Sequence, residues 1–412
     1  MDLMKILVLN AGSSSQKSRL YEVDGSLQEE PPTPLWQADA DWTGHQGTAD
    51  IEISTARSQT LHESLPASGR ENIIKRMLET IWSGTTKVIA QPAEIAIVGH
   101  RVVHGGPEYR QTTLVTPEVK AAIKQYAVFA PAHNPANLEG IQVVEQELPS
   151  VPQVAVFDTA FHRHLPLAAA VYPGPYEWFE QGIRRYGFHG ISHHYCAQRA
   201  AQLLRRDLEE LRLITCHLGN GCSLAAIYHG QSLDTTMGFT PLEGLMMGSR
   251  SGSVDPGILI HLLQHKGYSV EQVDKELNKA SGLLGISGVS SDMRQILQAR
   301  SEGNPRARLA FDIYIHRLRE AIGAMLATLG GVDALVFTAG VGEHAASVRA
   351  AACETFGFLN LALDPQKNAQ VPVDQDIATA ASSVRVLVIQ TQEDWMIAQE
   401  CWKLKKNSAS FQ

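Results

Sequence analysis

Arginine, histidine and carboxylate side chains recur along this chain next to small residues, either at the ends of apolar segments or in glycine-rich turns. In the segment 248–256, short Gly and Ser residues flank Arg250 and would let its guanidinium approach a ligand closely. Each such side chain alone is most simply interpreted as surface charge. Together they indicate a site that neutralises the charge of an anion. The candidate side chains are Arg101, His133, Asp158, His189, Arg250, Asp292, Arg294 and Glu393.

Three turns of small residues follow apolar segments, at 10–17, 217–221 and 340–344. Backbone N–H groups in such turns can converge on phosphate oxygens because small side chains allow a close approach, and Lys17 adds a positive charge. One turn of this kind is usually no more than a turn. Three of them in one chain favour phosphate binding, although the Walker pattern of P-loop proteins is absent.

Two other kinds of chemistry have partial patterns in the sequence. The segment 340–345 matches the loose dinucleotide fingerprint G-x-G-x-x-A and suggests a nicotinamide-dependent dehydrogenase, but only about seventy residues follow it, too few for the rest of such a domain. Two histidine pairs with a spacing of four, His100 with His104 and His189 with His193, suggest a zinc hydrolase. Neighbouring glycines argue against one helical face. Both remain lower-ranked hypotheses.

Composition limits the class of protein. A length of 412 residues favours two large domains or three small ones, and 44% hydrophobic with 19% charged residues excludes a mainly disordered chain. The net charge of -8 gives no general positive field for nucleic acid or anionic lipid. Five cysteines without a C-x-x-C pair favour a reducing compartment, the cytoplasm. No apolar run is long enough to span a membrane.

Apolar segments rich in β-branched residues alternate with helical patterns, which is typical of α/β domains with ligand chemistry at strand ends. The polar segment 24–70 predicts antiparallel edge strands and loops. The expected strands are 6–9, 95–98, 154–157, 213–215, 334–337 and 384–389, and the expected helices are 71–82, 134–147, 194–211 and 307–329.

A weak internal repeat links two of the small-residue turns. Segments 6–15 and 213–223 each combine a strand with a small polar turn, and each is followed by a second strand. The repeat suggests a duplicated domain with a phosphate-facing turn in each half and the ligand between the halves. The alternative is that Gly, Ser and Asn turns are simply common in hairpins.

Ordered motifs give the chain a close resemblance to the acetate kinase family over nearly its full length. They are Asn10-Ala-Gly-Ser-Ser-Ser-Gln-Lys17, Gly99-His-Arg-Val-Val-His-Gly-Gly106, Phe157-Asp-Thr-Ala-Phe-His162, Tyr186-Gly-Phe-His-Gly-Ile-Ser-His193, His217-Leu-Gly-Asn-Gly221, Asp234-Thr-Thr-Met-Gly-Phe-Thr-Pro-Leu-Glu-Gly244, Ser290-Ser-Asp-Met-Arg294 and Thr338-Ala-Gly-Val-Gly-Glu343.

The resemblance implies an α/β fold of two duplicated actin-like, ribonuclease H-like domains with the active site in the cleft between them. Residues 1–158 with 394–412 would form the first domain, and 159–393 a second, nucleotide-binding and dimerisation domain. The implied reaction is reversible, Mg²⁺-dependent transfer of the ATP γ-phosphoryl group to acetate, with Mn²⁺ as an alternative ion. The implied protein is a cytoplasmic homodimer that binds a small carboxylate and ATP, and neither nucleic acid nor membrane.

The resemblance also implies roles for single residues. Asp158, His189 and Arg250 would be catalytic, and Asn10 and Glu393 would bind the metal. The carboxylate would be held by Arg101, and the acyl pocket by Val103, Ala132, His133, Phe188 and Pro241. ATP would contact Lys17, His217, Leu218, Gly219, Asn220, Gly221, Asp292, Met293, Arg294, Gly340, Val341, Gly342, Glu343 and His344.

These roles agree with elementary chemistry. A carboxylate is already ionised at pH 7, so its phosphorylation requires no strong base and depends on charge neutralisation and in-line alignment. Asp158 is therefore expected to orient a cation or metal-bound water. Two departures from the family pattern affect specificity: Ala132 stands where Leu is usual and suggests propionate kinase activity as an alternative, and His344 replaces the usual Asn of the nucleoside loop.

Overall fold

The chain folds into two compact units. The computed structural model describes residues 3–12, 15–28, 30–42, 47–66, 69–131 and 133–409. The first unit comprises Met1–Ala160 with Gln392–Gln412, and the second comprises Phe161–Thr391. The sequence places these junctions at 158 and 394, and the roles it assigns to each domain stay predictions. No helix in the described ranges combines the length and apolar character needed to cross a membrane.

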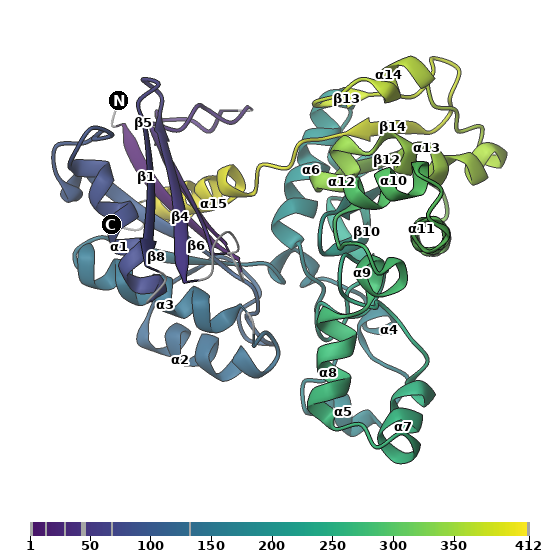
Figure 1. Ribbon diagram of the computed structural model, residues 1–412. Helices are drawn as coiled ribbons and strands as arrows, with labels where there is room; N and C mark the ends of the chain where they lie inside the picture. The colour runs from purple at the N-terminus through teal and green to yellow at the C-terminus, as the bar shows by residue number, and fades with distance from the viewer. Residues whose placement is uncertain are drawn as a thin grey trace. The chain divides into compact units, whose positions relative to one another are not determined.

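The first unit is a mixed sheet with helices on both faces (Figure 1). Its described strands follow the order β5-β4-β3-β2-β1-β6-β8-β7. The strands are β1 Met4–Ala11, β2 Ser15–Val23, β3 Trp36–Asp41, β4 Thr48–Thr55, β5 Thr60–Pro66, β6 Ile95–Val102, β7 Thr113–Leu114 and β8 Gln153–Phe157, and the helices are α1 Arg70–Trp82, α2 Pro117–Gln125, α3 Asn134–Glu147 and α15 Glu393–Ala409.

The second unit has its own sheet, in the order β11-β10-β9-β12-β14-β13. Its strands are β9 Leu213–Leu218, β10 Cys222–Tyr228, β11 Gln231–Thr235, β12 Ala334–Thr338, β13 Gln375–Asp376 and β14 Arg385–Val388. Its helices are α4 Leu167–Ala170, α5 Tyr176–Glu180, α6 Gly190–Leu204, α7 Pro256–His265, α8 Val270–Lys279, α9 Gly282–Ser287, α10 Met293–Ser301, α11 Pro305–Leu329, α12 Ala339–His344, α13 Ala346–Glu354 and α14 Pro365–Ala369.

The two sheets repeat one topology. In β3-β2-β1-β6-β8 and in β11-β10-β9-β12-β14, the first three strands are antiparallel and the last three are parallel. Hairpins can join antiparallel neighbours directly, whereas parallel neighbours need long crossovers that place helices on the faces. The repeated sequence segments 6–15 and 213–223 lie in the corresponding hairpins. The expected duplicated actin-like fold is confirmed.

Strand alternation decides which residues of the first sheet meet which helices. Leu7 and Leu9 belong to the hydrophobic cluster formed with α1 and α3. Val8 pairs with Gly99 on β6, and Gly99 faces α15. Since side chains alternate along a strand, α15 covers the face opposite to α1 and α3. Asn10 and Arg101 continue the pattern of Val8 and Gly99, so they lie on the α15 face.

The expected strands all form, and two other expectations need correction. The predicted helix 194–211 is wrong at its end: α6 stops at Leu204 because Arg205 adopts a left-handed conformation with φ 51°. The predicted loop 340–344 is the short helix α12. Its first turn is stabilised by the Glu343 carboxylate, which accepts a hydrogen bond from the Ala339 N–H at 2.8 Å, a local cap that outweighs two glycines.

The contact between β6 and α15 gives a stability prediction. A Cβ atom on Gly99 would lie 2.5 Å from the Cys401 Sγ and 2.7 Å from the Ile397 Cγ2 atom. Gly99→Ala is therefore expected to lower the free energy of unfolding by about 1–3 kcal/mol, the usual cost of overpacking a core. Urea unfolding measures this change.

A matched glycine in the same unit serves as the control. Gly140, in α3, has no atom within 4 Å of the position that an added methyl group would occupy. Gly140→Ala should therefore raise the free energy of unfolding by about 0.5–1 kcal/mol, because alanine loses less entropy in a helix. Equal unfolding midpoints for both variants would contradict close packing of α15 against Gly99.

Candidate active site

The first group of candidate residues lies at one edge of the first sheet. Asn10 is near the end of β1, Arg101 near the end of β6, and Asp158 directly after β8. These three strands are parallel, so their carboxyl ends share an edge. Glu393 begins α15, which packs on β1 and β6. The fold thus gathers four residues that are up to 383 positions apart in sequence.

Hydrogen bonds connect these residues in two sets, and electrostatic interactions link the two sets into one network. The Arg101 Nη2 donates to the Asp158 Oδ2 at 2.9 Å, and Asp158 is 1% exposed. The Asn10 Nδ2 lies 2.8 Å from the Asp394 Oδ1 and 3.5 Å from the Glu393 Oε2. Within the described part of the chain, the buried Arg101 Nε has no hydrogen-bond partner. A buried donor without a partner is unusual in a folded protein.

Burial and neighbouring charges shift the pKa values of this group. Burial raises the pKa of Glu393, and the nearby Asp158 and Asp394 raise it further against the opposing effect of Arg101. Burial opposes the charge of Arg101, but the Asp158 and Glu393 carboxylates hold its pKa above the ordinary arginine value. The site therefore combines a permanent cation with an excess of carboxylates, which would attract a further cation.

Two members of this network were not predicted from the sequence. Asp394 accepts the shorter hydrogen bond from Asn10, and it lies 3.8 Å from the Arg19 Nε. Arg19 also forms a two-pronged pair with Asp39, at 2.9 and 3.1 Å. The available signal was strand alternation, because Arg19 pairs with Val8 and so shares the α15 face.

The oxygen atoms at this edge fit a hard divalent cation. Asn10 uses its amide N–H groups toward the two carboxylates, which leaves its Oδ1 without a hydrogen bond to the described residues. Carboxylate and amide oxygens are ligands that Mg²⁺ prefers. No three His, Cys, Asp or Glu side chains in the described ranges converge on a metal position. This agrees with the usual coordination of Mg²⁺, which takes one or two protein carboxylates and completes its coordination shell with substrate phosphates and water.

In the second unit, Arg250 and His189 converge beside Gly221. A Cβ atom on Gly221 would lie 2.6 Å from the Arg250 Nη2 and 3.3 Å from the His189 Nε2. The turn between β9 and β10 therefore needs a residue without a side chain here. Burial lowers the pKa of Arg250, but arginine stays charged in proteins. The pair brings a guanidinium and an imidazole together against the backbone, and both groups can donate hydrogen bonds to anionic oxygens.

His189 has an unusual backbone conformation for its residue type. It precedes α6 with φ 55° and ψ 26°, in the left-handed region that non-glycine residues rarely occupy. Its ring stacks on His217 of β9 with centroids 4.1 Å apart. Strained conformations of this kind persist where surrounding contacts enforce them and are common at functional sites.

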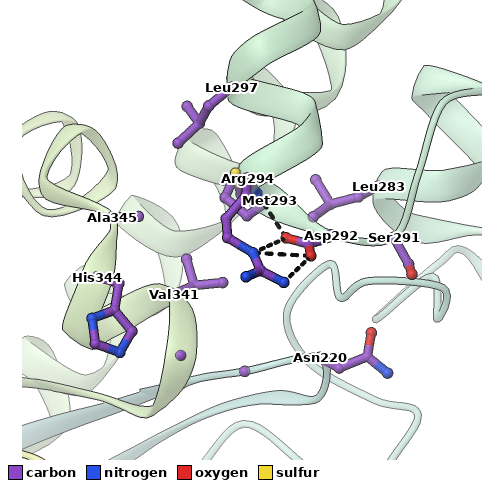
Figure 2. A pocket seen from close by; sticks show the side chains of 12 residues that line it. Asn220, Leu283, Ser291, Asp292, Met293, Arg294, Leu297, Val341, His344 and Ala345 are labelled. Atoms are coloured by element: carbon purple, nitrogen blue, oxygen red, sulfur yellow. Dashed lines mark hydrogen bonds and ion pairs between the residues drawn. The ribbon is translucent and has the colours of Figure 1, made fainter.

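A pocket of about 690 Å³ lies beside this turn in the second unit. Figure 2 shows side chains of α10 on one side of it, with Val341 and His344 of α12 on another. Asp292 caps α10 and pairs with the Arg294 guanidinium at 2.6 Å. The lining consists of Gly219, Asn220, Leu283, Ser291, Asp292, Met293, Arg294, Leu297, Gly340, Val341, His344 and Ala345.

The lining combines predicted and unpredicted residues. Sequence reasoning missed four of them, which are Leu283, Ser291, Leu297 and Ala345. These residues are small or apolar, so their types alone do not indicate a binding role. The role becomes visible only when the helices bring them together around the pocket. Six residues predicted to contact ATP are not in the lining: Lys17, His217, Leu218, Gly221, Gly342 and Glu343. The Glu343 carboxylate instead accepts backbone hydrogen bonds from Ala339 and Thr391.

The remaining predicted residues are divided between the two units. Val103 and Phe188 are buried, and His133 precedes α3. The Pro241 carbonyl accepts a hydrogen bond from the Arg250 Nη1 at 2.5 Å. Lys17 is exposed on β2. Ala132 lies outside the described residues, so the predicted widening of the acyl pocket stays a prediction.

Known proteins resemble the chain over its whole length. The profile of the Acetokinase family matches residues 5–399. An acetate kinase of Cyanothece sp. is 65% identical over 408 residues, 99% of this chain and 100% of that protein. A solved acetate kinase of Porphyromonas gingivalis is 39% identical, with a TM-score of 0.88 over 97% of this chain and 99% of that chain. A solved propionate kinase of Francisella tularensis is 36% identical, with a TM-score of 0.87 and the same coverage. The chain belongs to the acetokinase family.

Proposed function

We propose that the chain is an enzyme that transfers the γ-phosphoryl group of ATP reversibly to acetate, forming acetyl phosphate and ADP. The observation that carries the proposal is the match over 99% of the chain to a protein named acetate kinase. The chemistry of the candidate residues supports it, because their cations and N–H donors suit a reaction between anions.

The edge of the first sheet is the proposed carboxylate site. The Arg101 guanidinium, whose side chain is 12% exposed, would donate to an oxygen of the substrate. Asp158 holds the same guanidinium through its Nη2. A guanidinium fixed in this way can bind a carboxylate with defined orientation. Asp158 then acts as an orienting group, in agreement with a reaction that needs no strong base.

The same edge is the proposed Mg²⁺ site. Glu393 and the Asn10 Oδ1 would hold the ion, and Asp394 would keep the Asn10 amide oriented with its oxygen toward the ion. A bound divalent cation supplies charge neutralisation for the phosphate oxygens of the nucleotide. Mn²⁺, which takes the same oxygen ligands, is the expected substitute.

The second unit is proposed to bind ATP and to stabilise the transferred group. The pocket between α10 and α12 has the volume and the largely apolar lining expected of a nucleoside site. Arg250 and His189 would donate to the oxygens of the phosphoryl group. Their convergence at Gly221 supports this role, because two groups able to donate to phosphate oxygens lie side by side there.

Propionate kinase activity is the second candidate, favoured by the solved propionate kinase at 36% identity and by Ala132 at the predicted acyl pocket. One assay tests both functions. The purified chain is incubated with ATP, Mg²⁺ and acetate, propionate or butyrate, and acyl phosphate is trapped with hydroxylamine. The ratio of kcat/KM values decides between the acids. Absence of trapped product with every acid, together with nicotinamide reduction, would overturn the proposal in favour of a dehydrogenase.

A cytoplasmic homodimer is also proposed, and helix α7 supports the dimer. No residue of α7 is buried, and Ile258 and Ile260 are 48% and 54% exposed. A helix this apolar normally packs against a partner, and a second copy of the chain is the occupant we propose.

The five cysteines are all buried and unpaired, which suits a reducing compartment.

Arg250→Ala should lower kcat by roughly 10³-fold, as expected when a charge-stabilising arginine is removed from a phosphoryl-transfer site. The pocket beside α10 does not include Arg250, so ATP binding measured by calorimetry should change little. Thermal melting provides the folding control. A correctly folded variant with nearly normal kcat would remove Arg250 from the mechanism.

Arg101→Lys should raise the KM for the carboxylate at least as strongly as it lowers kcat. Lysine keeps the charge but loses the planar fork that can hold Asp158 and a second carboxylate together. Steady-state kinetics with ATP saturating measure both constants. If the lysine variant matched the parent in both, the carboxylate would have to bind elsewhere.

Ile260→Asp should convert the dimer to a monomer, because a charge on the proposed interface would be buried without a partner. Leu309→Asp is the matched control, since Leu309 is 52% exposed on α11, a different helix. Sedimentation velocity distinguishes the two forms. A monomeric parent chain, or a dimeric Ile260→Asp variant, would contradict an interface on α7.

A further inference from the structure

A buried chain of hydroxyl groups and histidines leads from the second sheet to His189. The His193 Nδ1 lies 2.7 Å from the Thr215 Oγ1, and the His193 Nε2 lies 2.8 Å from the Ser223 Oγ. The Ser223 Oγ in turn lies 2.9 Å from the His189 Nδ1. Thr215, His193 and Ser223 are each 0% exposed. Each ring nitrogen of His193 therefore meets a hydroxyl group, and water has no access.

Secondary structure brings these side chains together. Thr215 and His217 are two positions apart on β9, and Ser223 of β10 pairs with His217, so all three lie on one face of the sheet. Helix α6 packs against β9, with His189 just before its first residue and His193 in its first turn. His193 is thereby inserted between Thr215 and Ser223.

His193 is neutral in this setting. Burial lowers its pKa well below the ordinary histidine value, and the neighbouring His162 and His217 lower it further. A neutral imidazole has one N–H donor and one acceptor nitrogen. The hydrogen bonds between Thr215 and His189 must then all donate in one of two directions. The direction determines which nitrogen of His189 carries a proton.

The Thr215 hydroxyl decides the direction. Among the described residues, its oxygen has no polar partner other than the His193 Nδ1. If His193 donated from Nδ1, the buried Thr215 proton would have no acceptor, which costs free energy. If Thr215 donates to Nδ1 instead, every proton is satisfied: the His193 Nε2–H donates to Ser223, and the Ser223 hydroxyl donates to the His189 Nδ1.

We propose that Thr215, His193 and Ser223 are positioning residues that hold neutral His189 in the tautomer with its proton on Nε2. The inference rests on the proposed function, in which His189 donates to the transferred phosphoryl group. The His189 Nε2 lies on the Gly221 side, close to the Arg250 Nη2. A neutral N–H beside a guanidinium provides a second donor without a second full positive charge in a buried place.

The direct test is the tautomeric state of His189 in the intact protein. Protein labelled with ¹⁵N-histidine is studied by long-range ¹H–¹⁵N NMR at a pH where His189 is neutral, and His189→Gln assigns the signal. The expected spectrum has a protonated Nε2 and an unprotonated Nδ1. A protonated Nδ1 in neutral His189 would overturn the proposal without any variant and without an activity measurement.

Thr215, at the end of the hydrogen-bond chain farthest from His189, offers the most discriminating pair of variants. Thr215→Val keeps the shape and removes the hydroxyl, whereas Thr215→Ser keeps the hydroxyl. Thr215→Val should give a mixture of His189 tautomers and lower kcat by roughly 10- to 100-fold, the range for losing a partner that orients a functional histidine. The KM values for ATP and the carboxylate should stay near those of the parent. Thr215→Ser should restore both the tautomer and kcat.

Controls separate this proposal from a general packing effect. Ser382 is a buried serine in the same unit whose Oγ donates to the Val384 carbonyl at 2.7 Å, so Ser382→Ala should leave the His189 tautomer unchanged. If Thr215→Val does not fold, Ser223→Ala takes its place with the same expected mixture. An unchanged His189 tautomer in folded Thr215→Val or Ser223→Ala would overturn the proposal. The predicted tautomer in a parent that makes no acyl phosphate would support the hydrogen-bond chain and contradict the proposed function.

Discussion

The buried ion pair between Arg101 and Asp158 is the interaction on which the edge of the first sheet depends. Asp158 is 1% exposed, so its carboxylate has almost no access to solvent. Removing one partner of such a pair usually costs about 3–5 kcal/mol because the other charge stays buried and uncompensated. The same guanidinium also offsets the charge of Glu393. One arginine thus allows several carboxylates to lie within a small volume.

The duplicated topology carries different chemistry in each half. At the end of β1, the first unit places an amide and carboxylates, which suit a metal ion and an anchored guanidinium. At the corresponding end of β9, the second unit places stacked histidines and a glycine turn, which suit phosphate oxygens. The same backbone arrangement serves both, because parallel strands end at a common edge whatever side chains they carry.

Helix α12 shows how buried polar groups shape the pocket that we propose for the nucleoside. Arg349 is 0% exposed and donates to the carbonyls of Gly342 and Glu343 at 2.9 and 2.8 Å. The Glu343 carboxylate caps the other end of the same helix. These bonds satisfy the terminal groups that a six-residue helix cannot satisfy itself, so Val341 and His344 are presented at fixed positions.

By itself, the sequence determined the strands, the duplicated α/β fold, the family and most of the residues that gather at the two strand ends, because hydrophobic period and motif order are local signals. It did not determine the end of α6 or the helical state of 340–344, which depend on the left-handed Arg205 and on the cap from Glu343. Only the tertiary structure decided that Asp394 and Arg19 join Asn10, that apolar residues such as Leu283 line the pocket, and that a hydroxyl chain reaches His189. Contacts of this kind join distant segments. Their side chains acquire a role only when folding has excluded water and brought donors and acceptors from different elements together.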